Sequence, residues 1–405
     1  MDTAAPEVSL KRTITLPLLT FYGLGNILGA GIYVLVGKVA GVAGYAIPLA
    51  FLVASLVAGI SAFSYAELAG RFPKSAGEAV YLQEGFGRQW LSLLTGLAIA
   101  FAGMISSAAL ARGFSGYFSV LFSAPADAVT TILLIMLGLL AIWGISESLR
   151  VAALFTVIEI AGLLLIVWVA RSSFTELPAH LGQMFSFSEG AWQGISIGAF
   201  LAFYAFIGFE DMVNVAEEVR QPARIFPLAI GLALLIATAL YIAVALAAVL
   251  TLPPAVLADQ DAPLAAVYQQ STGRDPHLIS LIGMFAVING ALIQIIMASR
   301  LLYGLSRNGW LPARLGRVHS TTRTPVFATL LVTATVILLA LFFPLERLAA
   351  GTSILVLMVF TLVNMALIRI KRKQKPGPGI LAVPNWLPWL GVLLSLGLLM
   401  LQLVI

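Results

Sequence analysis

The sequence predicts an all-α polytopic membrane protein with about eleven transmembrane helices. Of the 405 residues, 60% are hydrophobic and only 10% are charged, whereas soluble domains carry about 25% charged residues. Apolar runs of about 20 residues recur along the chain, and the period-two alternation of a membrane β-barrel is absent from them. The expected spans are 14–40, 45–70, 91–121, 128–145, 151–170, 194–213, 225–251, 278–303, 326–344, 348–369 and 385–405.

The basic residues predict the orientation. With the N-terminus in the cytoplasm, eighteen of the 23 Lys and Arg residues fall on the cytoplasmic side, as the positive-inside rule requires. An odd number of spans then places the C-terminus outside the cell inner membrane, which the chain crosses many times. The basic run KRKQKPGPG (371–379) is either a stop signal before the last helix or a contact for anionic lipid.

Several classes of function are excluded by composition. The chain has no cysteine, so disulfides, thiolate metal sites and cysteine nucleophiles cannot occur. Its three histidines fall in polar connecting segments, and the loops contain no Ser/His/Asp or phosphate-loop pattern. The basic residues sit in short loops and form no nucleic-acid-binding stripe. We therefore expect no enzyme activity, no metal, no cofactor and no nucleic-acid partner.

The first span contains signals of a helix break. Gly23, Gly25, Gly29 and Gly31 crowd into FYGLGNILGAGIYV (21–34) together with Asn26. Glycine lets the backbone leave the helix, and the freed polar groups must find protein, water or ligand partners inside a bilayer. The alternative is close helix packing through the GxxxG pair of Gly25 and Gly29.

The sixth span favours the break. Glu210 and Asp211 follow Gly208 within an otherwise apolar helix, where a charge costs on the order of 3 kcal/mol or more. The first and sixth spans are corresponding members of two five-helix halves. Paired interruptions at corresponding positions are typical of an inverted repeat with a polar site at the midplane.

The fifth span adds Glu159, about half way across an apolar helix. A carboxyl group at that depth can take up and release a proton, so the first hypothesis is proton coupling. The alternative is a protonated structural side chain bonded to a neighbouring helix. Arg112, in the third span, is expected to reach the interface with its charged end.

Four stretches resemble the amino acid–polyamine–organocation (APC) superfamily. They are GAGIY (29–33), SYAELAGRFPKSAGEAVYL (64–82), GFEDMVNVAEEVRQPARIFPLAI (208–230) and ASRLLYGLSRNGWLP (298–312). The resemblance implies a LeuT-like 5+5 inverted repeat with broken helices 1 and 6. It also implies a cytoplasmic tail over 1–13, a ten-helix core over 14–370 with repeats at about 14–170 and 194–370, a basic cytoplasmic loop over 371–384 and an eleventh helix over 385–405.

The resemblance also implies roles for individual residues. Backbone amides in the first helix would hold the carboxylate of an amino acid, and the break in the sixth helix would hold its ammonium group. The implied substrate-binding residues are Asn26, Gly29, Ala30, Gly31, Ile32, Phe203, Tyr204, Ala205, Phe206 and Gly208. The implied coupling or gate residues are Glu210, Asp211, Glu217, Glu218 and Arg224.

The expected activity is secondary transport of an amino acid by alternating access. Small neutral substrates and proton symport are favoured, and an exchanger of amino acids or polyamines is the alternative. Many relatives carry Lys where this chain has Glu159, so a proton, a sodium ion or a cationic substrate group remain open as its ligand. The expected partners are thus the substrate, a coupling proton or sodium ion, and the lipid bilayer, while the oligomeric state is open.

Overall fold

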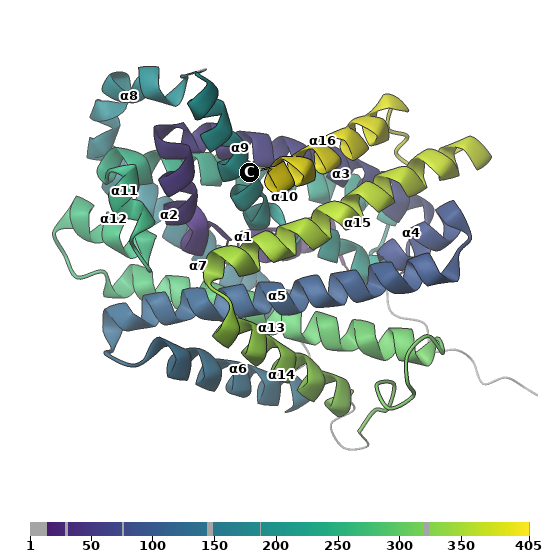
Figure 1. Cartoon of the computed structure of the whole chain (residues 1–405). Coiled ribbons are helices and arrows are strands. Elements are labelled where there is room, and N and C mark those ends of the chain that lie inside the picture. The colour runs from purple at the N-terminus through teal and green to yellow at the C-terminus, as the bar shows by residue number, and fades with distance from the viewer. Residues whose placement is uncertain are drawn as a thin grey trace, which may run out of the picture.

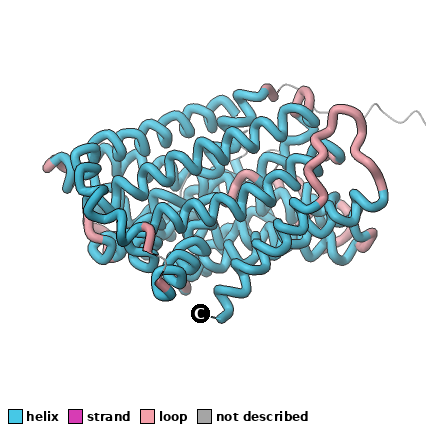
Figure 2. Tube along the Cα trace, turned by 90° about the horizontal axis from the view of Figure 1, so that it is seen from above, coloured by secondary structure: helices cyan, strands magenta, loops and turns pink. Residues whose placement is uncertain are grey.

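A computed structural model describes residues 14–28, 31–74, 77–143, 149–186, 188–319 and 324–404. Nearly all of them are helical, and most loops lie at the two ends of the helix bundle (Figure 2). Seven described stretches are long and apolar enough to cross a membrane, and four shorter apolar helices accompany them. Each of the eleven predicted spans corresponds to helix in this structure, which confirms the polytopic all-α prediction.

The first group of helices contains the first, second, sixth and seventh predicted spans. The first span consists of α1 (Leu16–Leu28) and α2 (Gly31–Ala43). The others are α3 (Ile47–Arg71), α9 (Glu189–Phe203) and α10 (Pro222–Thr251). α3 packs against α9 and α10, while α1 contacts α10 and α2 contacts α9.

The second group contains the third, fourth, eighth and ninth spans. They are α5 (Gln89–Leu121), α6 (Ala126–Trp143), α13 (His277–Arg307) and α14 (Val326–Phe342). α5 and α13 form the largest helix contact in the structure and run side by side in Figure 1. α6 and α14 cover the outer side of this pair.

The fifth and tenth spans contact both groups. α7 (Leu149–Val169) packs on α1 and α10 and also on α13. α15 (Leu345–Lys373) packs on α5, α3 and α9, and α16 (Trp386–Val404) lies against α15 and α3. Short helices in the connections are α4 (Gly77–Phe86), α8 (Leu177–Met184), α11 (Pro254–Ala258) and α12 (Pro263–Thr272).

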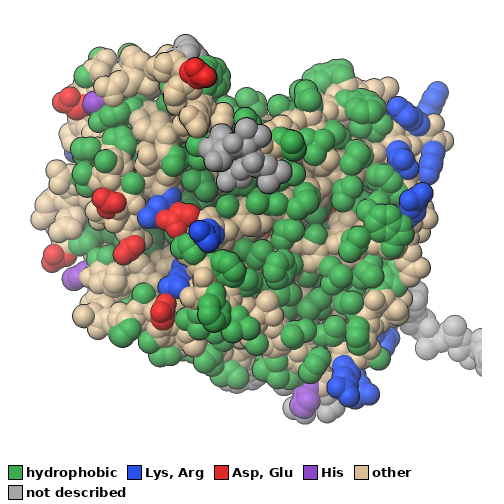
Figure 3. Space-filling model, in the orientation of Figure 1, with side chains coloured by type: hydrophobic (Ala, Val, Ile, Leu, Met, Phe, Trp, Pro, Cys, Tyr) green, Lys and Arg blue, Asp and Glu red, His purple; other side chains and the backbone are tan. Residues whose placement is uncertain are grey.

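The surface has the polarity of a membrane protein. Hydrophobic side chains cover the broad middle of the face in Figure 3, and charged side chains lie towards the two ends. Exposed Leu, Ile, Phe and Trp side chains occur on most of the long helices, and burial in lipid is what makes such a surface stable. The chain is therefore a multi-pass membrane protein.

The sixth span, predicted over 194–213 with an interruption near Gly208, is not one continuous helix. Its helix begins earlier, at Glu189, and ends at Phe203; a 3₁₀ turn (Tyr204–Phe206) follows, and a second 3₁₀ segment, η4, covers Glu210–Glu218. The interruption includes the Gly208–Asp211 stretch that the sequence indicated, while the α-helix itself ends five residues earlier, at Phe203.

A buried ion-pair cluster fastens one end of the structure. Glu67 of α3 is fully buried and accepts hydrogen bonds from Arg71 at 2.6 Å and from Lys371 of α15 at 2.9 Å. The same carboxylate accepts the Val383 backbone N–H at 2.8 Å, in the segment before α16. One side chain thus ties α3, α15 and the connection to α16 together.

We predict that Glu67→Gln lowers stability strongly. Removing the carboxylate leaves Arg71 and Lys371 without their buried partner, which typically costs about 3–5 kcal/mol. Thermal unfolding of the purified protein in detergent measures the change. Glu84→Gln, at an exposed carboxylate on α4, is the control and is expected to unfold at the wild-type temperature; equal unfolding temperatures for both variants would contradict the prediction.

Candidate functional site

The interruption of the sixth span is fixed by a glycine. Between Phe206 and Glu210, Gly208 has a φ of 128°, a backbone conformation that other residues rarely adopt. The side chain of Glu210 turns back, and its carboxylate accepts the Gly208 backbone N–H at 2.8 Å. The acidic residue therefore helps to satisfy a backbone group that the interrupted helix leaves free.

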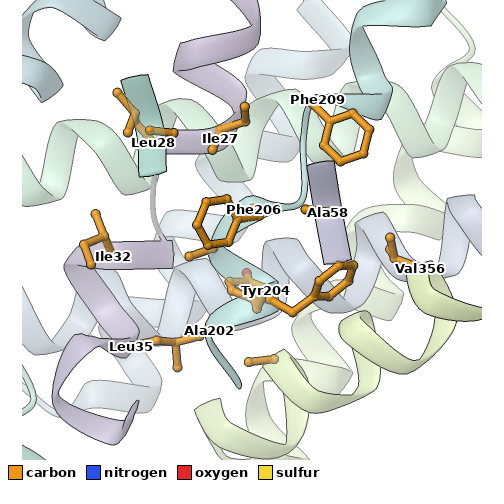
Figure 4. Close-up of a cluster of buried hydrophobic side chains, with 14 of the residues drawn as sticks. Ile27, Leu28, Ile32, Leu35, Ala58, Ala202, Tyr204, Phe206, Phe209 and Val356 are labelled. Atoms are coloured by element: carbon orange, nitrogen blue, oxygen red, sulfur yellow. The ribbon is translucent and has the colours of Figure 1, made fainter. Parts of the chain in front are cut away.

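The two interrupted spans meet at the centre of the molecule. A Cβ atom on Gly31, at the start of α2, would overlap the backbone of Ala205, and one on Gly208 would overlap the backbone of Asn26. The backbones of the first and sixth spans are thus so close at Gly31 and Gly208 that only glycine fits at these two positions. Figure 4 shows Phe206 lying between Ile27 and Leu28 of α1 and Ile32 of α2.

Tyr241 of α10 joins the two spans directly. Its hydroxyl lies 2.6 Å from the Ile27 carbonyl oxygen and 2.8 Å from the Ala205 carbonyl oxygen, and its side chain is fully buried. One hydroxyl proton is therefore shared between a carbonyl group of the first span and one of the sixth. This bond sets the distance between α1 and the turn that follows α9.

Three cavities lie in a row along α5. The inner cavity, of about 20 Å³, reaches from Ile99 to Ser106; the central one, of about 30 Å³, touches Ser106 and Leu110; the outer one, of about 390 Å³, extends from Arg112 to Ser119. Twenty residues of helix cover about 30 Å, the thickness of the hydrocarbon core. The row of cavities therefore extends over about 30 Å of α5.

The central cavity is polar but uncharged. The amide nitrogen of Asn26 lies at it, buried and without a hydrogen-bond partner among the described residues. Tyr204 and Ser106 exchange a 3.0 Å hydrogen bond on another side. About 30 Å³ holds roughly two water molecules, so a larger ligand enters only if the walls separate. The lining residues are Asn26, Ile27, Gly31, Ser106, Leu110, Tyr204, Ile207, Gly290, Ile293 and Gln294.

The predicted substrate residues that the structure describes divide into two groups, and two further residues lie outside the described part of the chain. Asn26, Gly31 and Tyr204 line the central cavity, while Gly29 and Ala30 lie outside the described residues. The remaining residues, which are buried around the breaks without lining that cavity, are Ile32, Phe203, Ala205, Phe206 and Gly208.

The sequence reasoning missed the wall of the cavity that α5 and α13 provide. Ser106 on α5, and Gly290 and Gln294 on α13, line it. Their spans are continuous helices and contain none of the clustered glycines or acidic residues that indicate a break. Small and polar residues inside long apolar runs were the available signal.

The acidic residues of the sixth span lie at the inner cavity. Glu210 and Asp211 both line it, and the Gln294 amide donates to Asp211 at 3.3 Å. Gln294 lines the central cavity as well, as do Ser106 and Ile207, so the two spaces share a wall. The side chains of Glu217 and Glu218 lie outside the described residues, and Arg224 is exposed at the start of α10.

Glu159 lies inside the protein, next to the first span. Its side chain is 1% exposed, and neither carboxylate oxygen has a hydrogen-bond partner among the described residues. The Glu159 carboxyl group interacts with the side chain of Asn289 on α13, whose amide nitrogen has no other partner among the described residues. Tyr33 of α2 donates to the Glu159 backbone oxygen at 2.7 Å. Glu159 thus sits where α2, α7 and α13 meet, and not against lipid.

The outer cavity carries the charges that the central one lacks. Lys38 of α2 pairs with Glu346 of α15 at 3.0 Å, and Arg112 of α5 pairs with Asp127 of α6 at 2.7 Å. Arg112 is partly exposed there, which agrees with the interfacial position expected for it. The outer cavity has the size of a small-molecule site.

The fold and this row of cavities define a membrane transport protein. The amino acid permease family matches residues 14–405, and the chain belongs to that family. It is 32% identical to the vacuolar cationic amino acid transporter 2 of Arabidopsis thaliana over 89% of this chain, although it spans only 60% of that protein.

Two bacterial relatives match over more of their length. The branched-chain amino acid permease of Bacillus subtilis is 30% identical over 97% of this chain and 89% of its own. The methylthioribose transporter of the same organism is 28% identical, over 92% of this chain and 84% of its own. These names belong to the relatives, and they describe transporters.

We predict that Gly31→Ala disrupts the centre of the molecule. The new methyl group would force α2 away from Ala205, and overpacking of this kind costs about 1–3 kcal/mol. Gly59→Ala in α3 is the matched control, because a Cβ atom there meets nothing within 4 Å and alanine favours a helix by about 0.5–1 kcal/mol. In thermal unfolding in detergent, Gly31→Ala should lower the unfolding temperature and Gly59→Ala should raise it slightly. Similar unfolding temperatures would show that the two spans do not pack as described.

Proposed function

We propose that the protein is a secondary active amino-acid transporter that works by alternating access. The observation that carries this proposal is the central cavity between the two interrupted spans, flanked by a larger cavity on one side and a smaller one on the other. The central cavity, of about 30 Å³, is too small for an amino acid in this arrangement. Transport therefore requires the two helix groups to move relative to each other.

The proposed substrate is a small neutral amino acid. Within the described residues, no charged side chain lines the central cavity. The N-terminus of α2 begins at Gly31 beside the cavity, and the amides of such a terminus favour a carboxylate; the amides of Gly29 and Ala30 would extend this site. The unpaired Asn26 amide nitrogen is a further donor.

The ammonium group would bind to carbonyl oxygens of the sixth span. The 3₁₀ turn after α9 ends in extended backbone at Ile207, so its carbonyls are not all used within a helix. The Ala205 carbonyl already accepts from Tyr241. The Tyr204 carbonyl accepts the Ile207 backbone N–H. We therefore assign this role to the carbonyls of Phe203 and Phe206, with Tyr204 as the side chain that covers the substrate.

We propose that the two helix groups are the moving parts and derive from a 5+5 repeat. Each group combines corresponding spans of the two halves: one and six with two and seven, and three and eight with four and nine. The fifth and tenth spans, α7 and α15, touch both groups. An inverted repeat produces this arrangement, and rocking of one group against the other exposes the central cavity alternately. The cell inner membrane, with the N-terminus in the cytoplasm, is the proposed location.

Glu159 is the proposed carrier of a coupling proton. Its carboxyl group is buried beside Tyr33 and Asn289 with no basic partner among the described residues. A lone carboxylate in such surroundings is costly unless it is protonated. Tyr33 belongs to α2, the helix that borders the substrate cavity, so loading of Glu159 is linked to the position of α2.

An exchanger of cationic amino acids or polyamines is the second candidate. The observation that favours it is the contact between the central cavity and the inner one, where Glu210 and Asp211 would meet a cationic side chain. The names of several relatives as cationic amino acid transporters agree with this alternative.

The test is uptake of labelled amino acids into proteoliposomes under an inward proton gradient. We predict accumulation that a protonophore abolishes, and loss of that accumulation in Glu159→Gln, because a neutral amide binds no proton at this position. Glu176→Gln, at an exposed carboxylate, is the control and should accumulate substrate as the wild type does.

Two outcomes would contradict the proposal. Uptake that occurs only into vesicles preloaded with amino acid identifies an exchanger. Gradient-driven accumulation that persists in Glu159→Gln removes this residue from the coupling path.

A further inference from the structure

Three acidic side chains from two elements converge at the inner end of the row of cavities. Glu210 and Asp211 come from η4, and Glu78 comes from the first turn of α4. All three are at most 6% exposed, and Glu78 interacts electrostatically with both of the others. α4 packs mainly on α15 and α5, and its first residue, Gly77, lies so close to η4 that a Cβ atom there would overlap Val213. The cluster thus lies where α4 closes against the sixth span.

Two tyrosine hydroxyls point to a ligand at this cluster. Tyr81 of α4 is fully buried next to Glu78, and its hydroxyl has no hydrogen-bond partner among the described residues. Tyr65 of α3 faces Glu78 with its hydroxyl and makes no other hydrogen bond. The inner cavity reaches Glu210 and Asp211 from the opposite side. Carboxyl groups, hydroxyls and a water-sized space are the parts of a proton-holding site.

Basic side chains stay away from the cluster in the described part of the chain. Lys74 is exposed. Arg369 lies over the Phe86 ring, and Lys373 reaches the Gly85 carbonyl oxygen; both contacts are at the opposite end of α4. α5 meets α4 through the neutral pair of Ser92 and Gln83. Three buried carboxylates without a cation would repel one another strongly, so the closed arrangement needs bound protons.

The position of Glu78 makes it the group that exchanges protons with water. It lies on a short helix outside the long apolar spans, and burial raises its pKa from 4.5 to about 7, with the charge of Asp211 adding to the effect. A carboxyl group exposed by movement of α4 returns to its ordinary pKa. The proton then leaves to water.

We propose that Glu78, with Glu210 and Asp211, forms a second proton-binding site whose occupancy holds the inner side of the transporter closed. This inference rests on the proposed transport function and adds a site separate from Glu159. The proton stays on the cluster while α4 covers η4, and it is released on the α4 side when that contact opens. When Glu78 loses its proton in the closed state, its carboxylate faces the acidic groups of η4. The repulsion between these negative charges favours the open state.

The direction of the pH effect follows from the two states. Glu78 has a higher pKa in the closed state than in the open state, so the closed state binds more protons. The closed state therefore loses stability relative to the open state as pH rises above 4.5. The open fraction should increase by about tenfold per pH unit over this window. The increase ends near pH 7, above which Glu78 is deprotonated in both states.

Cysteine labelling tests this proposal without any transport. The chain has no native cysteine, so Met297→Cys places one thiol in the wall of the inner cavity. Its rate of reaction with a water-soluble maleimide is measured in detergent from pH 5 to pH 8. Division by the rate of Gln374→Cys, an exposed site, removes the ionisation of the thiol itself. The normalised rate should rise about tenfold per unit up to pH 7 and then level off.

Variants of Glu78 decide the assignment. In Glu78→Gln the normalised rate should be independent of pH, and in Glu84→Gln, on the same helix but exposed, it should match the wild type. Glu78→Asp keeps a carboxyl group and should restore the dependence, which a merely structural role would not do. A pH profile that is flat in the wild type, or unchanged in Glu78→Gln, overturns the proposal. Failure of the transport proposal would show separately, as absence of uptake by wild-type vesicles.

Discussion

The hydrogen bond of Tyr241 to the carbonyl oxygens of Ile27 and Ala205 is the contact on which the centre of the structure depends. Backbone groups released by an interrupted helix find no water in a bilayer and must be satisfied by protein or ligand. Tyr241 satisfies one group from each interrupted span and holds the two together. Gly31 and Gly208 allow this approach, since a Cβ atom at either position would overlap the opposite chain. Gly31 and Tyr204, one from each span, line the central cavity, where we propose that the substrate binds.

The same arrangement gives each neighbouring residue its place in transport. α5 runs past all three cavities, so the helix that lines the proposed substrate cavity also lines the cavities on either side of it. Glu159 adjoins Tyr33 at one side of α2, and the acidic cluster with Glu78 adjoins the opposite end of the sixth span. Two buried sites that can hold a proton therefore flank one polar cavity. In the proposed mechanism, these two proton sites lie on different elements of the protein. A difference in proton concentration between the two sides of the membrane then favours movement of the helix groups in one direction.

Hydropathy predicted the eleven spans well, because a run of about 20 apolar residues has few alternatives in a membrane protein. The glycines of the first span and the Gly208–Glu210 stretch also indicated where the site lies. The sequence could not show that Ser106, Gly290 and Gln294 form the opposite wall, since that depends on how α5 and α13 pack. The side chains of Ala205 and Phe206 are buried around the break without lining the central cavity, because Tyr241 holds the Ala205 carbonyl and the Phe206 ring packs between α1 and α2. Glu78 gave no signal because its partners are more than 130 residues away in the chain.

The most direct test of the central claim is a structure determined with the transported amino acid bound. The account predicts ligand density between the start of α2 and the turn after α9, with the carboxylate near Gly31 and Asn26 and with Ser106 and Gln294 on the opposite side. Density confined to the outer cavity beside Lys38 and Glu346, with the two interrupted spans still in contact and the central cavity unchanged, would contradict it.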